Sequence, residues 1–237
     1  MEKNISLVIP CYNEEGNIDK LIERCNKFLS INNSELILVN NGSTDKTKDK
    51  ILNHSKINNK IKFLNIEKNI GFGHGVFIGL SSASNNFLAY THADLQTDPN
   101  DIVAGMDLIK SDNDFIKGIR IDKIKNEWSY FDMFISYSMT IFTSLIFRKF
   151  MNDIHAQPVI FHKKLIKNSN YYPKDFMFDV WVYIKAKKLK FNVKRFPVIF
   201  NKNMRFYGEG NNDTLMKTVK GSFLHIFGTI KLFLKLF

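Results

Sequence analysis

The segment 91–96 holds the side chains of this sequence that are best suited to chemistry. It reads Thr-His-Ala-Asp-Leu-Gln and follows a short apolar run, so an imidazole, a carboxylate and an amide stand at alternate positions. Alternate residues of an extended segment project to the same side, so His92, Asp94 and Gln96 could converge on one Mg²⁺ or Mn²⁺ ion. Such an ion would bridge the phosphates of a nucleotide diphosphate. An ordinary loop is the competing interpretation, because Asp is common in turns.

Alternating strands and helices are predicted to position this segment. The expected order is strand 5–10, helix 18–29, strand 35–39, helix 44–52, strand 61–66, a helix that begins in the Gly-rich turn 69–75 and runs to residue 84, and strand 86–91. Short connections between such units favour a mostly parallel sheet with helices on both faces. Ligands of such sheets bind beyond the carboxyl ends of the strands, where the polar clusters of this sequence fall.

Two long apolar segments mark the second half of the chain. Residues 128–147 carry Asp132 as their only charge, and these 20 residues are long enough to span a bilayer. Ser and Thr near their middle favour a core or interfacial helix instead. Residues 193–200 are predicted to form a strand. Residues 215–237 have a basic amphipathic pattern, which suits either an acidic membrane surface or a terminal helix packed on the domain.

The net charge of +11 is unevenly placed. Residues 1–119 carry 13 Lys and Arg against 15 Asp and Glu, whereas residues 120–237 carry 21 against 8. This asymmetry predicts an anionic partner for the second half, such as a phosphate group or an acidic membrane face. A nucleic-acid partner is not expected, because the basic residues are scattered and match no recognised nucleic-acid motif.

Cysteine usage and the first residues bear on the compartment. Cys11 and Cys25 are the only cysteines, with no CxxC pair and no disulfide framework, which is consistent with a reducing cytosol. The chain runs directly into a strand pattern, so a secretory signal is not expected.

Four ordered motifs give the sequence a family resemblance. They are Val-Ile-Pro-Cys-Tyr-Asn-Glu-Glu from residue 8, Leu-Val-Asn-Asn-Gly-Ser-Thr-Asp from residue 38, Asn-Ile-Gly-Phe-Gly from residue 69 and His-Ala-Asp-Leu-Gln from residue 92. In this order and spacing they resemble the family 2 glycosyltransferases with a GT-A fold, and within them the branch of dolichol- and polyprenyl-phosphate sugar transferases. A weaker likeness continues through residues 118–120, 153–158 and 205–210.

The resemblance implies an α/β fold of the GT-A type, with a Rossmann-like, mixed and mostly parallel sheet flanked by helices. Residues 1–212 would form the catalytic domain. Within it, residues 1–119 would be the nucleotide-sugar-binding half and residues 120–212 the acceptor-binding half. Residues 213–237 would form a C-terminal amphipathic helix that is suited to a membrane surface.

The resemblance also implies roles on the donor side. Pro10, Tyr12 and Glu14 match residues that frame the nucleotide base and ribose. Asn40 and Asn41 stand where the family usually has two Asp residues, one of which contacts the base. An Asn amide can still bond to a base edge or a ribose hydroxyl, and a helix cap or turn former is the alternative role.

Two further donor-side residues lie in glycine-containing loops. Gly71 would let the backbone come close to the ligand or to the sheet, and tight packing is the preferred interpretation of Gly71 and Gly73. Arg205 matches an Arg that closes on the diphosphate in the family, where it would exclude water and add positive charge.

The metal motif departs from the family pattern. His92 replaces the first Asp, while Asp94 and Gln96 keep the other two positions. Imidazole binds Mn²⁺ acceptably but is a poor ligand for Mg²⁺. We therefore expect Mn²⁺ or Mg²⁺ as cofactor, with Mn²⁺ favoured. Weak metal binding, a mechanism with little need of metal, and loss of activity stay open.

The acceptor side is expected in the second half. Asp153 aligns with an acidic acceptor-side position of the family, with Gln157 following it, and could orient the acceptor or act as a base. Asp179 is a second candidate, and a structural salt bridge or cap is the alternative for both carboxylates. Arg120 and His162 are plausible partners for an acceptor phosphate.

The resemblance implies an inverting hexosyltransferase of cell-envelope glycan biosynthesis. It would move a sugar from a UDP- or GDP-sugar to a lipid phosphate, most simply a polyprenyl phosphate. It would act at the cytoplasmic face of the cell membrane, held peripherally by acidic lipid or by a membrane partner protein. One alternative is the same transfer to a soluble saccharide or surface glycan, which would need a carboxylate base. Another is a nucleotide-binding module without catalysis.

Overall fold

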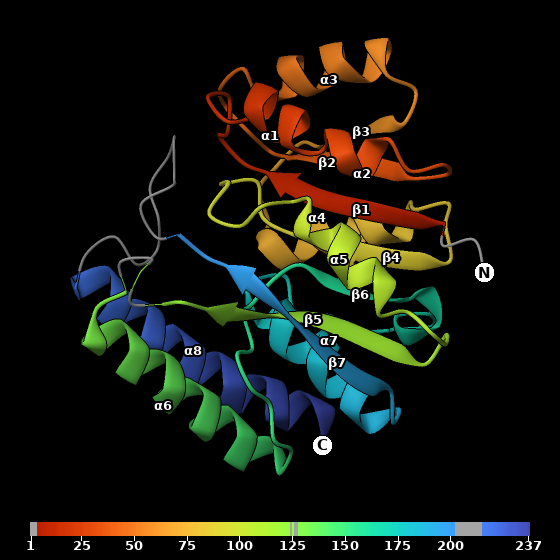
Figure 1. The fold of residues 1–237 in the computed structure, drawn as a ribbon. Helices are drawn as coiled ribbons and strands as arrows, with labels where there is room; N and C mark the ends of the chain where they lie inside the picture. Colours follow the sequence, from red (N-terminus) through yellow and green to blue (C-terminus); the bar gives the residue numbers. More distant parts are fainter. Residues whose placement is uncertain (1–3, 124, 126–127, 202–214) are drawn as a thin grey trace.

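The computed structural model describes residues 4–123, 125, 128–201 and 215–237 (Figure 1). In chain order the elements are β1 (Ile5–Cys11), α1 (Ile18–Arg24), α2 (Asn26–Leu29), β2 (Glu35–Asn41), α3 (Thr47–Ile57), β3 (Ile61–Ile66), α4 (Phe72–Ser81), β4 (Phe87–Tyr90), α5 (Asp101–Asp107), β5 (Asp114–Ile121), α6 (Tyr130–Phe147), β6 (Val159–His162), the short 3₁₀ helix η1 (Lys163–Leu165), α7 (Met177–Lys188), β7 (Asn192–Ile199) and α8 (Leu215–Leu236). All five predicted strands form. The helix expected at residues 44–52 begins and ends later, because residues 43–46 form the turn after β2.

The strands form one seven-stranded sheet in the order β3-β2-β1-β4-β6-β5-β7. β1 pairs in parallel with β2 and β4, β2 with β3, and β5 with β7. β6 runs antiparallel to both β4 and β5. The sheet is therefore mixed and mostly parallel, as predicted. The loops that follow β1, β2 and β4 consequently meet at one edge of the sheet.

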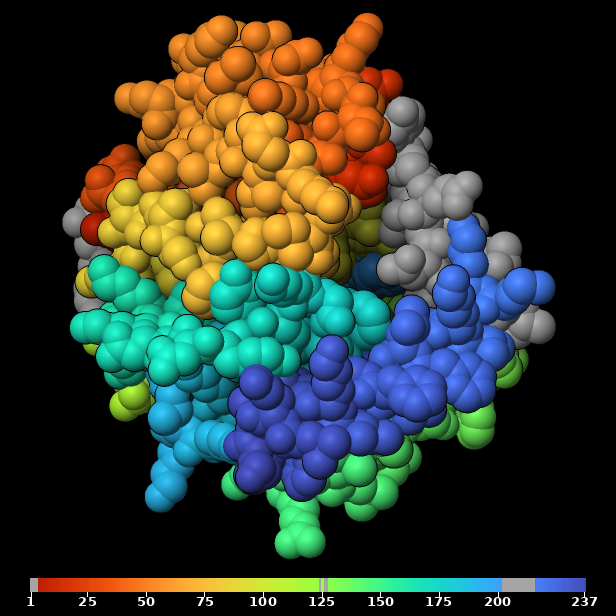
Figure 2. All heavy atoms as spheres, turned by 180° about the vertical axis from the view of Figure 1, so that it is seen from behind, coloured from red at the N-terminus to blue at the C-terminus, as the bar shows by residue number. Residues whose placement is uncertain are grey.

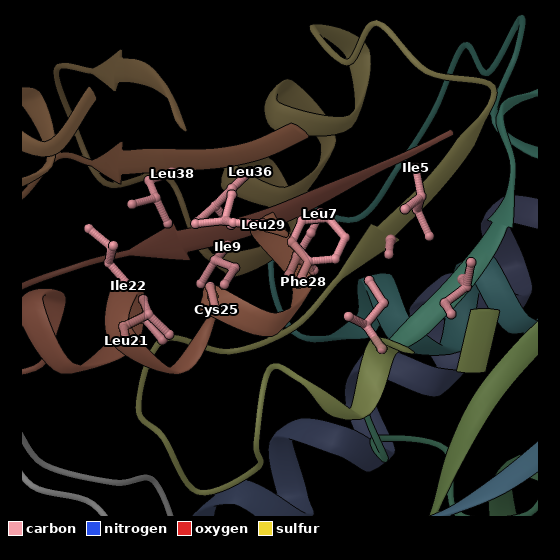
Figure 3. Packing of buried hydrophobic residues seen from close by; sticks show 14 of the residues in the cluster. Ile5, Leu7, Ile9, Leu21, Ile22, Cys25, Phe28, Leu29, Leu36 and Leu38 are labelled. Carbon is pink, nitrogen blue, oxygen red and sulfur yellow. The ribbon is translucent and has the colours of Figure 1, made fainter. Parts of the chain in front are cut away.

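Apolar side chains cover both faces of the sheet. All seven residues of β1 are buried, and successive side chains of a strand point to opposite faces. Ile5, Leu7 and Ile9 pack with residues of α1 and α2 (Figure 3), while Val8 packs on the other face with residues of α4 and α7. Burial on both faces explains why β1 has an almost continuous apolar sequence, and the one hydroxyl in it, that of Ser6, donates to Glu35.

The last helix packs beside α6 at the end of the molecule beyond β5 (Figure 1). At the start of α6, Ser129 and Asp132 each accept a hydrogen bond from the other's backbone N–H, which satisfies two donors of the first turn. α8 also contacts α7 and buries His225, Thr229 and Leu232. Figure 2 shows the rest of α8, in blue, on the molecular surface. The C-terminal helix is therefore packed on the domain along one face and exposed along the other.

Candidate active site

The end of β1 and the loop after it carry the three residues that the sequence assigned to the base and ribose. Pro10 is buried within the strand, whereas Tyr12, just beyond it, leaves its ring 46% exposed at the sheet edge. The backbone N–H of Glu14 donates to Thr47 Oγ1 at 2.8 Å, so this loop is fixed to the start of α3. An exposed aromatic ring on a fixed loop is suited to stacking on a base, and the three binding roles stay predictions.

The two asparagines at the end of β2 are buried and hydrogen-bonded within the protein. Asn40 donates to Asn65 Oδ1 at 2.7 Å and accepts from the N–H of Ser43 at 3.3 Å, so it stabilises the turn. Asn41 donates to the carbonyl of Gly71 at 3.2 Å. Its own Oδ1 is a buried acceptor with no hydrogen-bond partner in the described part of the chain. A contact with the nucleotide stays a prediction for both residues, and Asn41 has the unused acceptor.

The Gly-rich turn before α4 lies against the segment before α7. Gly71 has a φ of 130°, and a Cβ there would lie 2.3 Å from the carbonyl oxygen of Lys174. A Cβ at Gly73 would lie 2.4 Å from the carbonyl oxygen of Pro173. Close backbone packing, the preferred interpretation from the sequence, therefore requires both glycines. A ligand contact at Gly71 stays a prediction.

Replacing Gly71 by alanine is expected to lower the free energy of unfolding by roughly 2–4 kcal/mol, because the left-handed backbone and the contact with Lys174 both oppose a Cβ. Urea denaturation followed by circular dichroism measures the change. Gly221→Ala is the matched control, since Gly221 lies inside α8 and alanine favours a helix. Equal stability of the two variants would contradict the packing argument.

The segment 91–96 does not continue β4 as an extended strand, which corrects the sequence interpretation. β4 ends at Tyr90, and Leu95 has a φ of 62° that turns the chain. Asp94 Oδ1 accepts from the N–H of Gln96 at 3.2 Å, and the side chain of Gln96 is buried. The alternation thus fails at Leu95, because its left-handed backbone rotates the following residue out of register. His92 and Asp94 remain half-buried at the edge.

The ring of His92 is held by an aromatic neighbour. Its centroid lies 4.7 Å from that of Phe72, the first residue of α4, with 30° between the planes. This tilted ring contact holds the imidazole, two residues after β4, against the start of α4. The imidazole of His92 is thereby held at the edge of the sheet where the nucleotide is expected to bind.

The donor set available to a metal is small. No group of three or more His, Cys, Asp or Glu side chains in the described residues is arranged to hold a metal ion. By the chemistry of their side chains, one imidazole nitrogen and one carboxylate, His92 and Asp94 would suit a divalent ion, and their role as metal ligands stays a prediction. Gln96 fits less well because its side chain is buried. A nitrogen donor beside a single carboxylate suits Mn²⁺ better than Mg²⁺.

Two residues assigned to the acceptor pair with each other. The backbone N–H of Arg120 and its Nε each donate to the Asp153 carboxylate at 2.7 Å, and a guanidinium Nη donates as well. The Arg120 guanidinium also lies 4.8 Å from the ring of Trp128. Although burial opposes ionisation, Arg120 lowers the pKa of Asp153 to about 2. Asp153 is thus an ionised structural anchor for Arg120, and its oxygens are already occupied by N–H donors.

Asp179, the second candidate base, is also buried and occupied. Tyr90 donates its hydroxyl to Oδ1 at 2.7 Å, and Gln157 Nε2 lies 3.3 Å from the same oxygen. His155 Nδ1 lies 3.1 Å from Oδ2. Burial raises the pKa of Asp179, but the hydrogen bond from His155 and the charge of Lys117 outweigh it and lower the pKa to about 2. Gln157, predicted to bind the acceptor, is placed here as a support of Asp179.

These two carboxylates predict the acid sensitivity of the fold. Each has a pKa of about 2 in the folded state against 3.8 ordinarily, so each stabilises the fold above pH 4. The contribution is about 2 kcal/mol per carboxylate, and it is lost as pH falls from about 4 to about 2. Urea denaturation between pH 2 and pH 6 measures it. A flat unfolding free energy across that interval would contradict the assignment.

His162 is not part of this edge, which corrects its assignment to the acceptor phosphate. It ends β6, and because β6 is antiparallel its partner is Phe87 at the amino end of β4. His162 Nδ1 accepts the backbone N–H of Lys164, and Nε2 lies 3.7 Å from Asp112. The direction of one strand therefore places His162 at the opposite edge of the sheet.

Two basic residues near Asp153, the buried Lys117 and the half-buried Arg195, were not identified from the sequence. Lys117 in β5 is 1% exposed, and its ammonium donates to the carbonyl of Ala156. Arg195 in β7 donates to the carbonyl of Asn152 at 2.6 Å. Together they hold the backbone on both sides of Asp153. A lysine inside an apolar strand run was the available signal for Lys117. Arg205, the predicted diphosphate ligand, lies outside the residues that the structure describes.

Comparison with known proteins decides the family. Residues 6–169, more than half of the chain, match the family model described as Glycosyl transferase family 2. The chain belongs to glycosyl transferase family 2. The family predicted from the four motifs is thereby confirmed.

Relatives of this family 2 chain include proteins with named activities. A dolichol-phosphate mannosyltransferase of Pyrococcus furiosus is 27% identical over 236 residues, which cover 96% of this chain and 64% of the relative. An uncharacterized glycosyltransferase of Synechocystis sp. is 32% identical over 130 residues, which cover 54% of this chain and 41% of the relative. The chain therefore spans less than two thirds of the length of these curated relatives.

A solved structure confirms the predicted GT-A type of fold. It is glucosyl-3-phosphoglycerate synthase from Mycobacterium tuberculosis in complex with Mn²⁺, uridine diphosphate and glucosyl-3-phosphoglycerate. The TM-score is 0.66 at 13% identity, and the match covers 94% of this chain and 79% of the synthase.

Proposed function

We propose that this chain transfers a sugar, with inversion, from a UDP- or GDP-sugar to the phosphate of a polyprenyl lipid at the cytoplasmic face of the cell membrane. Family membership supports glycosyl transfer. The named activity of the Pyrococcus relative supports a lipid-phosphate acceptor. Cys11 and Cys25, buried and unpaired, are compatible with a reducing compartment.

The observation that carries the choice of acceptor is the state of Asp153 and Asp179. A hydroxyl acceptor needs a base to remove its proton, whereas a lipid phosphate already bears negative charge near neutral pH. Both candidate bases are buried, ionised and occupied by hydrogen-bond donors. Neither is therefore suited to taking a proton. Catalysis on a phosphate would rest on positioning and charge stabilisation instead.

The donor side of the proposal rests on the edge formed by the loops after β1 and β4. Tyr12 would stack on the base, while His92 and Asp94 would hold Mn²⁺ in preference to Mg²⁺. The synthase from Mycobacterium tuberculosis was solved with both Mn²⁺ and uridine diphosphate, which supports the binding of a divalent ion and a nucleotide by this fold. A divalent ion bound there would neutralise the diphosphate as it leaves.

The lipid side of the proposal rests on the α6–α8 surface, the solvent-facing side of these two helices. α6 is the one helix in the described part of the chain that is long and apolar enough to cross a membrane, and 17% of it is buried. The large apolar side chains exposed on the α6–α8 surface are Tyr130, Phe131, Phe134, Tyr137, Ile141, Leu145, Met216, Val219, Phe223, Leu224, Phe227, Ile230, Leu234 and Phe237. Exposed apolar area of this extent marks an interaction site.

Basic residues indicate which partner binds the α6–α8 surface. α8 carries four lysines and no acidic residue, and Arg148 and Lys149 follow α6 directly. Apolar side chains flanked by lysines match the interface of an acidic bilayer, where each lysine near the surface adds about 1 kcal/mol. We therefore assign the α6–α8 surface to an anionic lipid membrane, on which the chain lies peripherally.

Placing glutamate at Phe227 and Leu234 together is expected to weaken binding to acidic vesicles at least about tenfold, because two exposed apolar contacts with lipid are lost and two negative charges added. Co-sedimentation with vesicles of phosphatidylserine and phosphatidylcholine measures the affinity. Ile57→Glu on α3 is the matched control, since Ile57 is 84% exposed and lies away from the α6–α8 surface. Equal binding of both variants would exclude this surface.

The sugar donor and the acceptor are identified in two successive experiments. Stabilisation against heat by UDP, GDP and their sugars, with Mn²⁺ or Mg²⁺, ranks the donors directly. Transfer is then assayed to a polyprenyl phosphate and to soluble saccharides. Transfer to the lipid phosphate alone supports the proposal. Transfer to saccharides alone would replace it with the soluble-acceptor alternative, and nucleotide binding without any transfer would replace it with a binding module.

A further inference from the structure

A chain of hydrogen bonds connects the α6–α8 pair to the end of β4. Thr143 Oγ1 of α6 lies 2.8 Å from His225 Nε2 of α8, and His225 Nδ1 lies 3.2 Å from His155 Nε2. His155 Nδ1 lies 3.1 Å from Asp179 Oδ2, and Tyr90 donates to Asp179 Oδ1 at 2.7 Å. Five residues from five separate segments thus form one continuous path through the protein.

The charge of Asp179 sets the direction of its own hydrogen bonds on this path. The ionised carboxylate only accepts, so His155 Nδ1 and the Tyr90 hydroxyl both donate to it. The buried ring of His225 is hydrogen-bonded through both of its nitrogens, to Thr143 and to His155. The path is therefore continuous from α6 to the end of β4.

Burial makes the path costly to interrupt. Thr143, His225, Asp179 and Tyr90 are each less than 5% exposed. Burial, followed by the proximity of His155, lowers the pKa of His225 to about 3, so this ring is neutral. A buried donor or acceptor that loses its partner cannot turn to water instead. Movement of α6 or α8 is consequently opposed by the groups beneath them.

The two ends of the path have different surroundings. One end is anchored in helices whose opposite faces form the exposed α6–α8 surface. The other end, the Tyr90 hydroxyl, belongs to the last residue of β4, directly before the segment 91–96 with His92 and Asp94. Apolar side chains at Thr143 and His225 would pack these helices as well, without the need to satisfy buried polar atoms. The polar path adds a fixed geometric connection between them.

We propose that the path Thr143–His225–His155–Asp179–Tyr90 is a positioning relay, through which the seating of the α6–α8 surface on lipid sets the position of the segment 91–96. The relay rests on the proposed membrane function of that surface. It assigns Thr143, His225 and His155 as positioning residues that touch neither donor nor acceptor. Docking on lipid would order the helix pair, and the relay would pass that order to the donor site.

The relay is tested by amide hydrogen exchange of the full chain, read by mass spectrometry on peptides covering residues 87–96, without nucleotide. Thr143→Val removes one hydroxyl at constant shape, and His225→Phe keeps a ring but removes both nitrogens. Thr229→Val is the matched control, because Thr229 lies one turn after His225, is fully buried, and has a hydroxyl with no hydrogen-bond partner among the residues described. Melting temperatures verify that each variant is folded.

In buffer, the amide hydrogens of residues 87–96 should exchange at least about fivefold faster in the two relay variants than in wild type and Thr229→Val, because Thr143→Val loses one hydrogen bond of the path and His225→Phe loses two. With phosphatidylserine vesicles, exchange should slow in wild type and in Thr229→Val but not in the relay variants, although all four bind. Identical exchange of Thr143→Val and Thr229→Val in both conditions would overturn the relay.

Failure of the proposed function gives a different result. If wild type does not bind vesicles, the membrane assignment fails, and the comparison in buffer alone still decides whether the path positions residues 87–96. If wild type binds vesicles without any change at residues 87–96, the transmission from lipid to the donor site is wrong. Absence of nucleotide binding affects neither comparison, because no nucleotide is present.

Discussion

Replacing Asp94 by asparagine is expected to lower the rate of sugar transfer roughly a hundredfold to a thousandfold, the usual cost of removing one preorganised electrostatic contact at a developing charge. Asp94 is the only carboxylate in the predicted donor set, so its replacement removes the only negative charge of that set. Asparagine has the same shape and can still accept the N–H of Gln96, which the carboxylate accepts at 3.2 Å. The rate of sugar transfer should therefore fall without a loss of the fold.

Two measurements check this result. Initial rates of transfer at saturating donor give the change in kcat, and Mn²⁺-dependent stabilisation by the nucleotide reports the metal separately. Asp112→Asn is the control, because Asp112 is exposed and lies beside His162 at the opposite edge of the sheet. Transfer by Asp94→Asn at the wild-type rate, with or without Mn²⁺, would show that the segment 91–96 holds no essential metal.

Replacing Asp153 by asparagine is expected to lower the free energy of unfolding by about 3–5 kcal/mol, because the Arg120 guanidinium, only 12% exposed, would lose its counter-charge. The backbone is not the cause, since Asp153 has a φ of 46° and asparagine tolerates the left-handed region. Urea denaturation at pH 7 measures the change. At pH 2 the difference from wild type should shrink, because the wild-type carboxyl is then partly protonated.

An exposed ion pair supplies the matched comparison. Asp19 pairs with Lys50 and His54 on the surface and is 61% exposed, so Asp19→Asn should cost less than about 1 kcal/mol. A loss below about 1 kcal/mol in Asp153→Asn as well would mean that Arg120 finds another partner. Where Asp153→Asn remains folded, a mild change in transfer rate supports the phosphate acceptor, and a large one supports a hydroxyl acceptor.

The sequence alone was sufficient for the fold and the family. Apolar runs such as Ile5–Ile9, interrupted only by Ser6, were recognisable because a strand buried on both faces is mostly apolar along its length. The motifs around Tyr12, Asn41, Gly71 and Asp94 were recognisable because turns at the sheet edge need particular backbone freedom and particular donors. These requirements are local, so residues close together in the sequence are enough to reveal them.

Only the tertiary structure decided which distant side chains meet. It placed Arg120 against Asp153, turned the polar residues at Asp179 into a path reaching α8, and moved His162 to the far edge. Each of these outcomes depends on the direction of a strand or on packing between segments far apart in sequence. Hydrophobic periodicity specifies the face on which a side chain lies but not its neighbour, so the pairings of buried charges could be read only from the folded chain.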